Sequence, residues 1–384
     1  MLDKLDLDQK KLGERFYLIC LGIYISVNFM SGTTFSKAYG LEAIVFFLRI
    51  SQLTAILVLL KVFLFDKHRF KDLCLLGALL GLLFIICKQA HELDPFFITC
   101  FILAAFKVDY KKILKVYIGT ELALLLGVYF ATLIRLVPNN IIWREGAGIV
   151  RAGLGLATPS DLAAHIFYLM LAYAVYRDFS FKKQELAYLG VISALVFAIT
   201  NSRLDAILMV LLLLALLFKQ TLFERLKALG TAWVTGIVIG YAFFDLLLTY
   251  FYTPTSPFYQ TLDLLLSRRL FFGQMAFLNY PLRFLGQYIY QNGTGDPRGF
   301  EIYYFIDSAF VQALMMFGII FFIGMLLLLS YLIKKSFKMS NYSLVVAILL
   351  IVFSMAINHH FWHISYNIII LATLAKLSAP VLEK

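Results

Sequence analysis

The chain has 384 residues, of which 61% are apolar and only 15% are charged, whereas an ordinary soluble domain has about 25% charged residues. This composition excludes a water-soluble enzyme. The formal charge of +11 is divided into small groups between apolar stretches, so it indicates membrane topology and argues against a nucleic-acid partner.

Apolar runs follow one another along the whole chain. They lie at about 16–31, 41–65, 72–88, 95–106, 113–137, 160–176, 186–200, 204–218, 229–251, 304–333, 342–358 and 364–378. Because a transmembrane helix needs about 20 apolar residues, we predict an all-α polytopic membrane protein with about twelve transmembrane helices. Residues 1–384 would then form a single integral membrane domain.

The longest connection, residues 252–303, joins the ninth and tenth predicted helices and far exceeds an ordinary inter-helix loop. Its middle part, TLDLLLSRRLFFGQMAFLNYP, has Thr261 as a predicted N-cap, Asp263 in the first turn and a stop at Pro281. The broad apolar face of this segment is typical of a helix that lies on the membrane surface. We therefore expect a long extracytoplasmic loop that carries a surface helix.

Lysine and arginine are distributed differently over the two sides of this predicted topology. With both termini inside, the inner connections carry nineteen lysines and four arginines, and the outer ones carry two lysines and nine arginines. The positive-inside rule is obeyed. Any solvated cation serves topology, but arginine binds phosphate oxygens through two parallel hydrogen bonds. The outer face is therefore predicted to bind an anion, the alternative being that its arginines reach lipid headgroups.

One outer segment, VRAGLGLATPSDLAAH, combines Arg151 with Gly153, Gly155 and the start of the sixth predicted helix. We expect Ser160 or Asp161 to be the N-cap of that helix and the glycines to form a flexible run. A helix N-terminus offers backbone N–H groups and a favourable dipole to an anion. Together with the arginine, this predicts binding of an anionic group.

Two further outer segments place arginine beside a helix end. Arg203 lies in the tight turn of ITNSRLDA, and Arg268 and Arg269 lie in the surface helix, in LLSRRLFF. We expect these three arginines to converge with Arg151 on one diphosphate.

Asp307 is the predicted proton acceptor. It follows the long loop directly and lies near the start of the tenth helix, where a partly desolvated carboxylate near cations is suited to be a general base. The alternative is that Asp307 only caps the helix. We expect five other outer residues to contact a sugar or to orient the residues that contact it. They are Arg283, Tyr288, Glu301, His359 and His360.

Two short patterns contain residue types that bind metals. These are His359-His360-x-x-His363 and Glu92-x-Asp94. We favour histidines that contact headgroups or sugar at the membrane interface, and we expect no metal and no other cofactor.

Three charged residues lie inside apolar runs, where charge is costly: Arg49, Glu121 and Asp245. Such residues are functional by default, but a buried structural pair would explain any two of them. Both interpretations stay open at this point.

Four short motifs resemble those of the O-antigen and exopolysaccharide polymerase (Wzy-type) and O-antigen ligase superfamily. They are R-A-G-L-G-L-A-T-P-S-D-L-A at 151–163, T-N-S-R at 200–203, S-R-R-L with a downstream Y-P-L-R-F-L-G at 267–286, and I-D-S-x9-G at 306–318. The long outer loop before the tenth helix and the two inner termini are also similar.

The resemblance implies a multi-pass glycosyltransferase that moves a sugar chain from polyprenyl diphosphate to an acceptor hydroxyl outside the membrane, without nucleotide or metal. Arg151, Arg203 and Arg268 or Arg269 would hold the diphosphate, and one displacement would invert the anomeric centre. Ligases of the superfamily carry histidine followed by Asn, Ser or Gln where this chain has Asp307 and Ser308. This difference weakens the ligase interpretation, although aspartate can accept the same proton.

The sequence thus favours a polysaccharide polymerase at the outer face of a bacterial cytoplasmic membrane. Its partners would be the lipid bilayer, a polyprenyl-diphosphate-linked oligosaccharide donor and acceptor, and chain-length regulator and flippase proteins. The alternatives are a ligase that transfers finished polymer, a lipid-linked oligosaccharide flippase and a non-catalytic scaffold. A flippase needs charged residues along a path open to both sides and two related halves, but here the arginines and the loop lie on one face.

Overall fold

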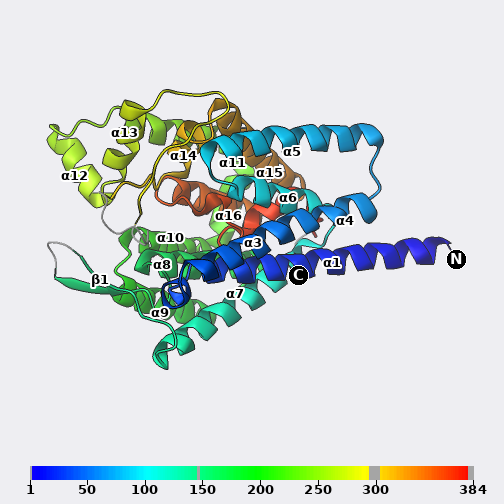
Figure 1. The fold of residues 1–384 in the computed structure, drawn as a ribbon, viewed down its shortest axis with the longest axis horizontal. Coiled ribbons are helices and arrows are strands. Elements are labelled where there is room, and N and C mark those ends of the chain that lie inside the picture. The colour runs from blue at the N-terminus through cyan, green and yellow to red at the C-terminus, as the bar shows by residue number, and fades with distance from the viewer. Residues whose placement is uncertain (1, 145–147, 294–302, 379–384) are drawn as a thin grey trace. The chain divides into compact units, whose positions relative to one another are not determined.

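The computed structural model of the protein describes residues 2–144, 148–293 and 303–378, and it is mostly helical (Figure 1). Among these residues, six helical spans are long and apolar enough to cross a membrane. They are Glu42–Leu64, Phe70–Ala90, Tyr110–Leu133, Lys183–Thr200, Lys219–Tyr250 and Ile319–Lys338. Twelve spans and their sidedness stay a prediction.

The chain divides into two compact units. Unit 1 comprises Met1–Leu76, Phe97–Lys219 and Ile364–Lys384, and unit 2 comprises Gly77–Phe96 and Gln220–His363.

Unit 1 is a bundle of helices. It contains α1 (Leu2–Ser31), α2 (Phe35–Tyr39), α3 (Leu41–Leu57), α4 (Leu59–Leu64), α7 (Tyr110–Leu133), α8 (Pro159–Tyr176), α9 (Lys183–Thr200), α10 (Arg203–Leu217) and the 3-10 helix η2 (Ile368–Thr373). Helix α1 packs against α3 and α7, and α8 packs against α7, α9 and α10. Part of the core lies where α1, α7 and α8 meet, around Phe29, Leu125 and Leu162.

The connection 138–159, which is predicted to lie outside, contains a β-hairpin, so the all-α prediction is wrong there. Strands β1 (Ile141–Arg144) and β2 (Ile149–Ala152) pair antiparallel, with Ile142 opposite Arg151. The β-branched residues of IIWR and IVRA favour extended backbone. The hairpin gives Arg151 a fixed place on a strand.

The twelfth apolar run, 364–378, does not form an α-helix. Apart from η2 it is irregular, and the backbone around Lys376 pairs with that around Asp109, because Lys376 N–H donates to Val108 O and Tyr110 N–H donates to Lys376 O. A segment buried within a protein reads as apolar whether it is helical or not, so hydropathy did not separate it from a membrane helix.

Unit 2 contains most of the predicted outer loop and the helices after it. Its elements are α11 (Lys219–Tyr250), α12 (Pro257–Leu265), α13 (Arg269–Asn279), α14 (Ala309–Met315), α15 (Ile319–Lys338), α16 (Tyr342–Met355) and the 3-10 helix η1 (His360–Trp362). Two further helices, α5 (Phe70–Ala90) and α6 (Asp94–Ala104), contribute to both units.

The predicted surface helix is two helices, α12 and α13. The chain turns between them at Ser267 and Arg268, which both have positive φ angles. Thr261 is not the N-cap, because its hydroxyl donates to Pro257 O inside α12. The second helix ends at Asn279, two residues before Pro281, so the predicted stop is confirmed.

The tenth predicted helix, 304–333, is also broken. Residues before Ala309 are not helical, and α14 and α15 are separated at Gly318, which has a φ of 91°. A Cβ atom at Gly318 would lie 2.5 Å from the backbone nitrogen of Gly286. Only glycine combines this positive φ with such close backbone packing.

Candidate functional site

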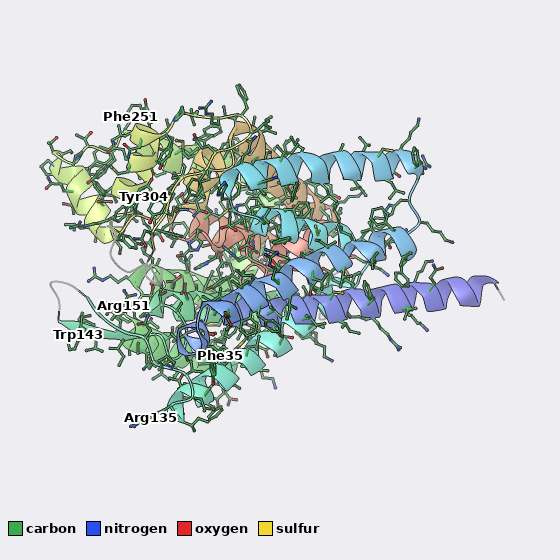
Figure 2. The ribbon with its side chains drawn as sticks, viewed as in Figure 1. Phe35, Arg135, Trp143, Arg151, Phe251 and Tyr304 are labelled. Carbon is green, nitrogen blue, oxygen red and sulfur yellow. The ribbon has the colours of Figure 1, made fainter. Side chains whose placement is uncertain are left out.

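In unit 1, Arg151 connects the β-hairpin to two helix ends (Figure 2). Its Nε donates to Thr200 O at 2.6 Å, and its Nη2 donates to Ser160 Oγ at 3.1 Å. Thr200 ends α9, and Arg203 is the first residue of α10 and is exposed. The structure therefore brings Arg151 to the turn that carries Arg203.

The segment that follows Arg151 is shaped by packing and capping. Thr158 is the N-cap of α8 and forms a capping box with Asp161, so the prediction of Ser160 or Asp161 as N-cap is wrong. Gly155 has a φ of 91°, and a Cβ atom there would collide with Thr132 of α7. Glycine is therefore needed at position 155 so that this segment can pack closely against α7. The prediction that the glycines form a flexible run is not confirmed.

Glu121 in α7 and His165 in α8 form the buried polar contact of unit 1. Glu121 Oε1 lies 2.5 Å from His165 Nδ1, and their side chains are 0% and 3% exposed. The ring of Tyr366 stacks on His165 at 3.9 Å between centroids. The partner of Glu121 is thus His165, which the sequence analysis did not identify. The signal that could have identified it is the position of His165, a polar residue inside the apolar run 160–176.

In unit 2, Arg269 and Asp307 lie together. Asp307 Oδ2 is 3.8 Å from Arg269 Nε. The guanidinium donates from Nε to Ile357 O at 2.7 Å and from Nη1 to Leu266 O at 3.0 Å. Because a guanidinium has five N–H donors, these two bonds fix Arg269 and leave donors for an anion.

Asp263 positions the start of α13. Its Oδ1 accepts from the backbone N–H groups of Leu270 at 2.9 Å and Phe271 at 3.1 Å, and its Oδ2 accepts from the hydroxyl of Tyr252. A carboxylate that accepts from the first N–H groups of a helix acts as a cap from another element. Asp263 thereby orients Arg269, whereas Arg268, in the left-handed conformation, is exposed.

Ser308, and not Asp307, is the N-cap of α14. Ser308 Oγ accepts from Val311 N–H and donates to Asp245 Oδ2 at 2.7 Å. The capping alternative for Asp307 is therefore wrong. Burial raises the pKa of Asp307, and the nearby Arg269 opposes that shift. Asp245 has Ser308 as its partner and Glu121 has His165, so these two charged residues are not paired with each other.

Two of the sequence motifs meet in unit 2. The Y-P-L-R-F-L-G segment and the residues around Gly318 are joined by backbone bonds from Ile319 N–H to Arg283 O, from Ile320 N–H to Phe284 O and from Gln287 N–H to Met316 O. The side chain of Arg283 itself is exposed. These bonds hold the end of the long loop against the turn after α14, whereas Asp307 lies just before α14.

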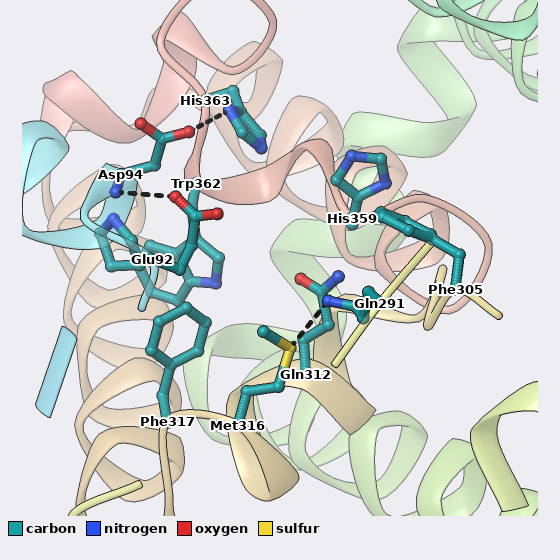
Figure 3. Close-up of a pocket in the computed structure, with 11 residues that line it drawn as sticks. Glu92, Asp94, Gln291, Phe305, Gln312, Met316, Phe317, His359, Trp362 and His363 are labelled. Atoms are coloured by element: carbon teal, nitrogen blue, oxygen red, sulfur yellow. Dashed lines mark hydrogen bonds and ion pairs between the residues drawn. The ribbon is translucent and has the colours of Figure 1, made fainter. Parts of the chain in front are cut away.

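A pocket of about 200 Å³ lies beside this turn (Figure 3). It is lined by Glu92, Asp94, Pro95, Gln291, Phe305, Gln312, Met316, Phe317, His359, Trp362 and His363. His359 lies edge-on to Phe305 at 4.8 Å between ring centroids. Burial lowers the pKa of His359 to about 3, and His363 and Arg269 add to the effect, so His359 is neutral at ordinary pH.

The remaining predicted contact residues fall in different places. Tyr288 is exposed and packs on His91 at 4.6 Å between ring centroids, whereas His360 is buried. Glu301 lies outside the described residues. In the part of the chain that the structure describes, no three His, Cys, Asp or Glu side chains are grouped to hold a metal ion.

The four arginines are divided between the units, because Arg151 and Arg203 belong to unit 1 and Arg268 and Arg269 belong to unit 2. Their convergence on one diphosphate stays a prediction. Comparisons of the chain with protein-family models, with curated proteins and with solved structures find no match.

Proposed function

We propose that the protein is a polysaccharide polymerase of the Wzy type, embedded in a bacterial cytoplasmic membrane. It transfers a growing glycan from polyprenyl diphosphate to a lipid-linked repeat unit at the outer face. The observation that carries the proposal is the arrangement of Arg269 and Asp307, 3.8 Å apart. The same unit has a pocket rich in hydrogen-bonding side chains, and Phe305, two residues before Asp307, lines it. The six apolar spans support the membrane location.

The proposed reaction is one displacement at the anomeric carbon of the donor. The acceptor hydroxyl oxygen attacks this carbon, and its proton goes to the Asp307 carboxylate. The bond from the carbon to the diphosphate oxygen breaks, and its electron pair leaves with the diphosphate, so the anomeric centre inverts. Arg269 stabilises the charge that develops on the leaving group. The raised pKa of Asp307 brings it closer to the working pH, which favours a general base.

The proposal is tested with purified protein in liposomes and a synthetic polyprenyl-diphosphate repeat unit, with EDTA present. We expect a ladder of products that differ by one repeat unit, because each product is the donor of the next transfer. A single transfer to an added lipid carrier, without a ladder, would identify a ligase. No transfer by folded protein would overturn the proposal.

The arginine is tested with Arg269→Gln, which removes the charge. Losing one donor to a developing oxyanion reduces turnover by about 100-fold or more, and we expect a loss of this size. The matched control is Arg225→Gln, because Arg225 is an exposed residue of α11 in the same unit. Equal turnover of the two variants would remove Arg269 from the site.

A further inference from the structure

The pocket of about 200 Å³ in unit 2 has a lining that excludes anions. It contains the carboxylates of Glu92 and Asp94, and the described residues that line it include no lysine or arginine. A phosphate or diphosphate would meet no lysine or arginine in this lining that could balance its charge. The pocket is therefore not a second diphosphate site.

The charges in the pocket are largely paired or absent. Asp94 Oδ2 lies 2.7 Å from His363 Nδ1 (Figure 3). His359 is neutral for the reasons given above. This leaves little net charge for a cationic ligand, and Glu92, whose Oε1 accepts from Asp94 N–H at 3.4 Å, is the residue with most freedom to accept a further hydrogen bond.

The polar groups of the pocket are mostly planar side chains with both donors and acceptors. Gln291 accepts from Ile306 N–H through Oε1, and among the described residues its Nε2 has only the sulfur of Met316 as a partner, at 3.3 Å. Gln312 donates to Ile306 O. An amide has two N–H donors, and sulfur is a weak acceptor, so Gln291 keeps capacity to bind a ligand hydroxyl.

Trp362 contributes apolar surface to the pocket. Its side chain lines the pocket, and the residue is 6% exposed. The indole Nε1 has no hydrogen-bond partner among the described residues, but it has almost no accessible surface even in the empty pocket. A ligand in the pocket would therefore meet the ring of Trp362 and not its N–H group.

We propose that this pocket binds one uncharged sugar ring, whose hydroxyls bond to Glu92 and Gln291 while its apolar face lies against the aromatic side chains. Sites for drug-sized ligands are about 300–1,000 Å³, so about 200 Å³ suits a single ring. Phe305, Phe317 and Trp362 provide the apolar surface. This proposal rests on the proposed function in one respect, because it assigns the ring to the acceptor, whose hydroxyl proton goes to Asp307 in the proposed reaction.

The test uses Trp362 as its own reporter. The chain has three tryptophans, and Trp143 and Trp233 are 66% and 70% exposed, so Trp143→Phe and Trp233→Phe leave Trp362 as the only one without disturbing packing. This variant in detergent is titrated with uncharged methyl glycosides of hexoses, deoxyhexoses and N-acetylhexosamines. Equilibrium dialysis of the same sugars measures binding independently of fluorescence.

We expect at least one sugar to change the fluorescence saturably and to be retained in dialysis. In the same background Glu92→Ala should weaken binding about tenfold, the effect of losing one hydrogen bond worth about 1.4 kcal/mol. Glu224→Ala, at an exposed position of α11, should leave it unchanged. Inorganic pyrophosphate and methylamine should give no saturable change.

Three results would overturn the proposal: no saturable sugar binding in either measurement, equal affinity in the Glu92→Ala and Glu224→Ala variants, or preferential binding of methylamine or pyrophosphate. Sugar binding does not depend on turnover. Sugar binding without a product ladder would therefore overturn the proposed polymerase activity and support the proposed sugar site. A product ladder without sugar binding would support the polymerase activity and overturn the sugar site.

Discussion

In unit 1 the side chains of Glu121 and His165 are enclosed in the interior, 0% and 3% exposed, whereas in unit 2 the side chains of Asp307 and Arg269 are 20% and 14% exposed. Arg151 donates to Thr200 and Ser160, and Glu121 lies against His165 in the interior. In unit 2, Arg269 and Asp307 are 3.8 Å apart. The comparison teaches that similar ionisable groups are fully enclosed in one unit and reached by solvent in the other, and our proposal assigns chemistry to the second pair.

The largest effect is expected at Asp307. Removing a general base costs about 100-fold to 10,000-fold in turnover, so Asp307→Asn should lose nearly all activity in the ladder assay. The same change should raise the unfolding temperature at about pH 7, because burial raises the pKa of Asp307 and folding is then opposed by the ionised form. Stability from this group is fully present below the unfolded pKa of about 3.9 and is lost as pH rises through the folded pKa.

The stability gain of Asp307→Asn should therefore shrink as the pH falls toward about 4. Thermal unfolding in detergent at both pH values measures it. A variant that is inactive and less stable at neutral pH would show that Asp307 holds the structure together, and the contrast between the units would fail.

The next largest effect is expected at His165, in the other unit. His165→Ala leaves the Glu121 carboxylate buried without a partner, which costs about 3–5 kcal/mol. We expect a large drop in unfolding temperature, with turnover per folded molecule little changed. Adding Glu121→Ala should recover part of the loss, and this double-mutant cycle isolates the pair. If turnover falls while stability is kept, the pair has a functional role and the comparison needs revision.

A smaller effect is expected at Gly318. Gly318→Ala places a Cβ atom 2.5 Å from Gly286 N in a backbone with a φ of 91°, and strain of this kind costs about 1–3 kcal/mol. Gly240→Ala is the control, because Gly240 lies in α11 and a Cβ there meets nothing within 4 Å. Unfolding temperatures of the two variants measure the difference. Equal values would mean that the contact between the two motifs contributes nothing to unit 2.

Part of this site was predictable from the sequence. Arg269 and Asp307 were selected because arginine beside a helix start and a carboxylate after a long loop have recognisable chemistry, and the structure brings them together. Arg151 and Arg203 were selected on the same ground, and the structure connects them through Thr200. The helix end before Pro281 was predictable because proline cannot continue a helix.

Other features depended on residues far apart in the chain. The cap of α13 comes from Asp263 across the turn at Ser267 and Arg268, so one predicted helix became two. The break at Gly318 depends on backbone 32 residues earlier, at Gly286. Glu92 and His363 line the same pocket, and no local sequence pattern predicts that they lie close together.

By itself the sequence determined that this chain is rich in apolar helices, that its lysines and arginines differ in distribution, and which helix ends carry polar chemistry, because composition, periodicity and capping are local properties. Only the tertiary structure decided which charged groups are paired, which glycines are needed for close approach, and that Glu92, Gln291 and Trp362 line one pocket. The physical reason is that pairing and cavity formation depend on which distant segments are packed against each other, and hydropathy along the chain does not specify that.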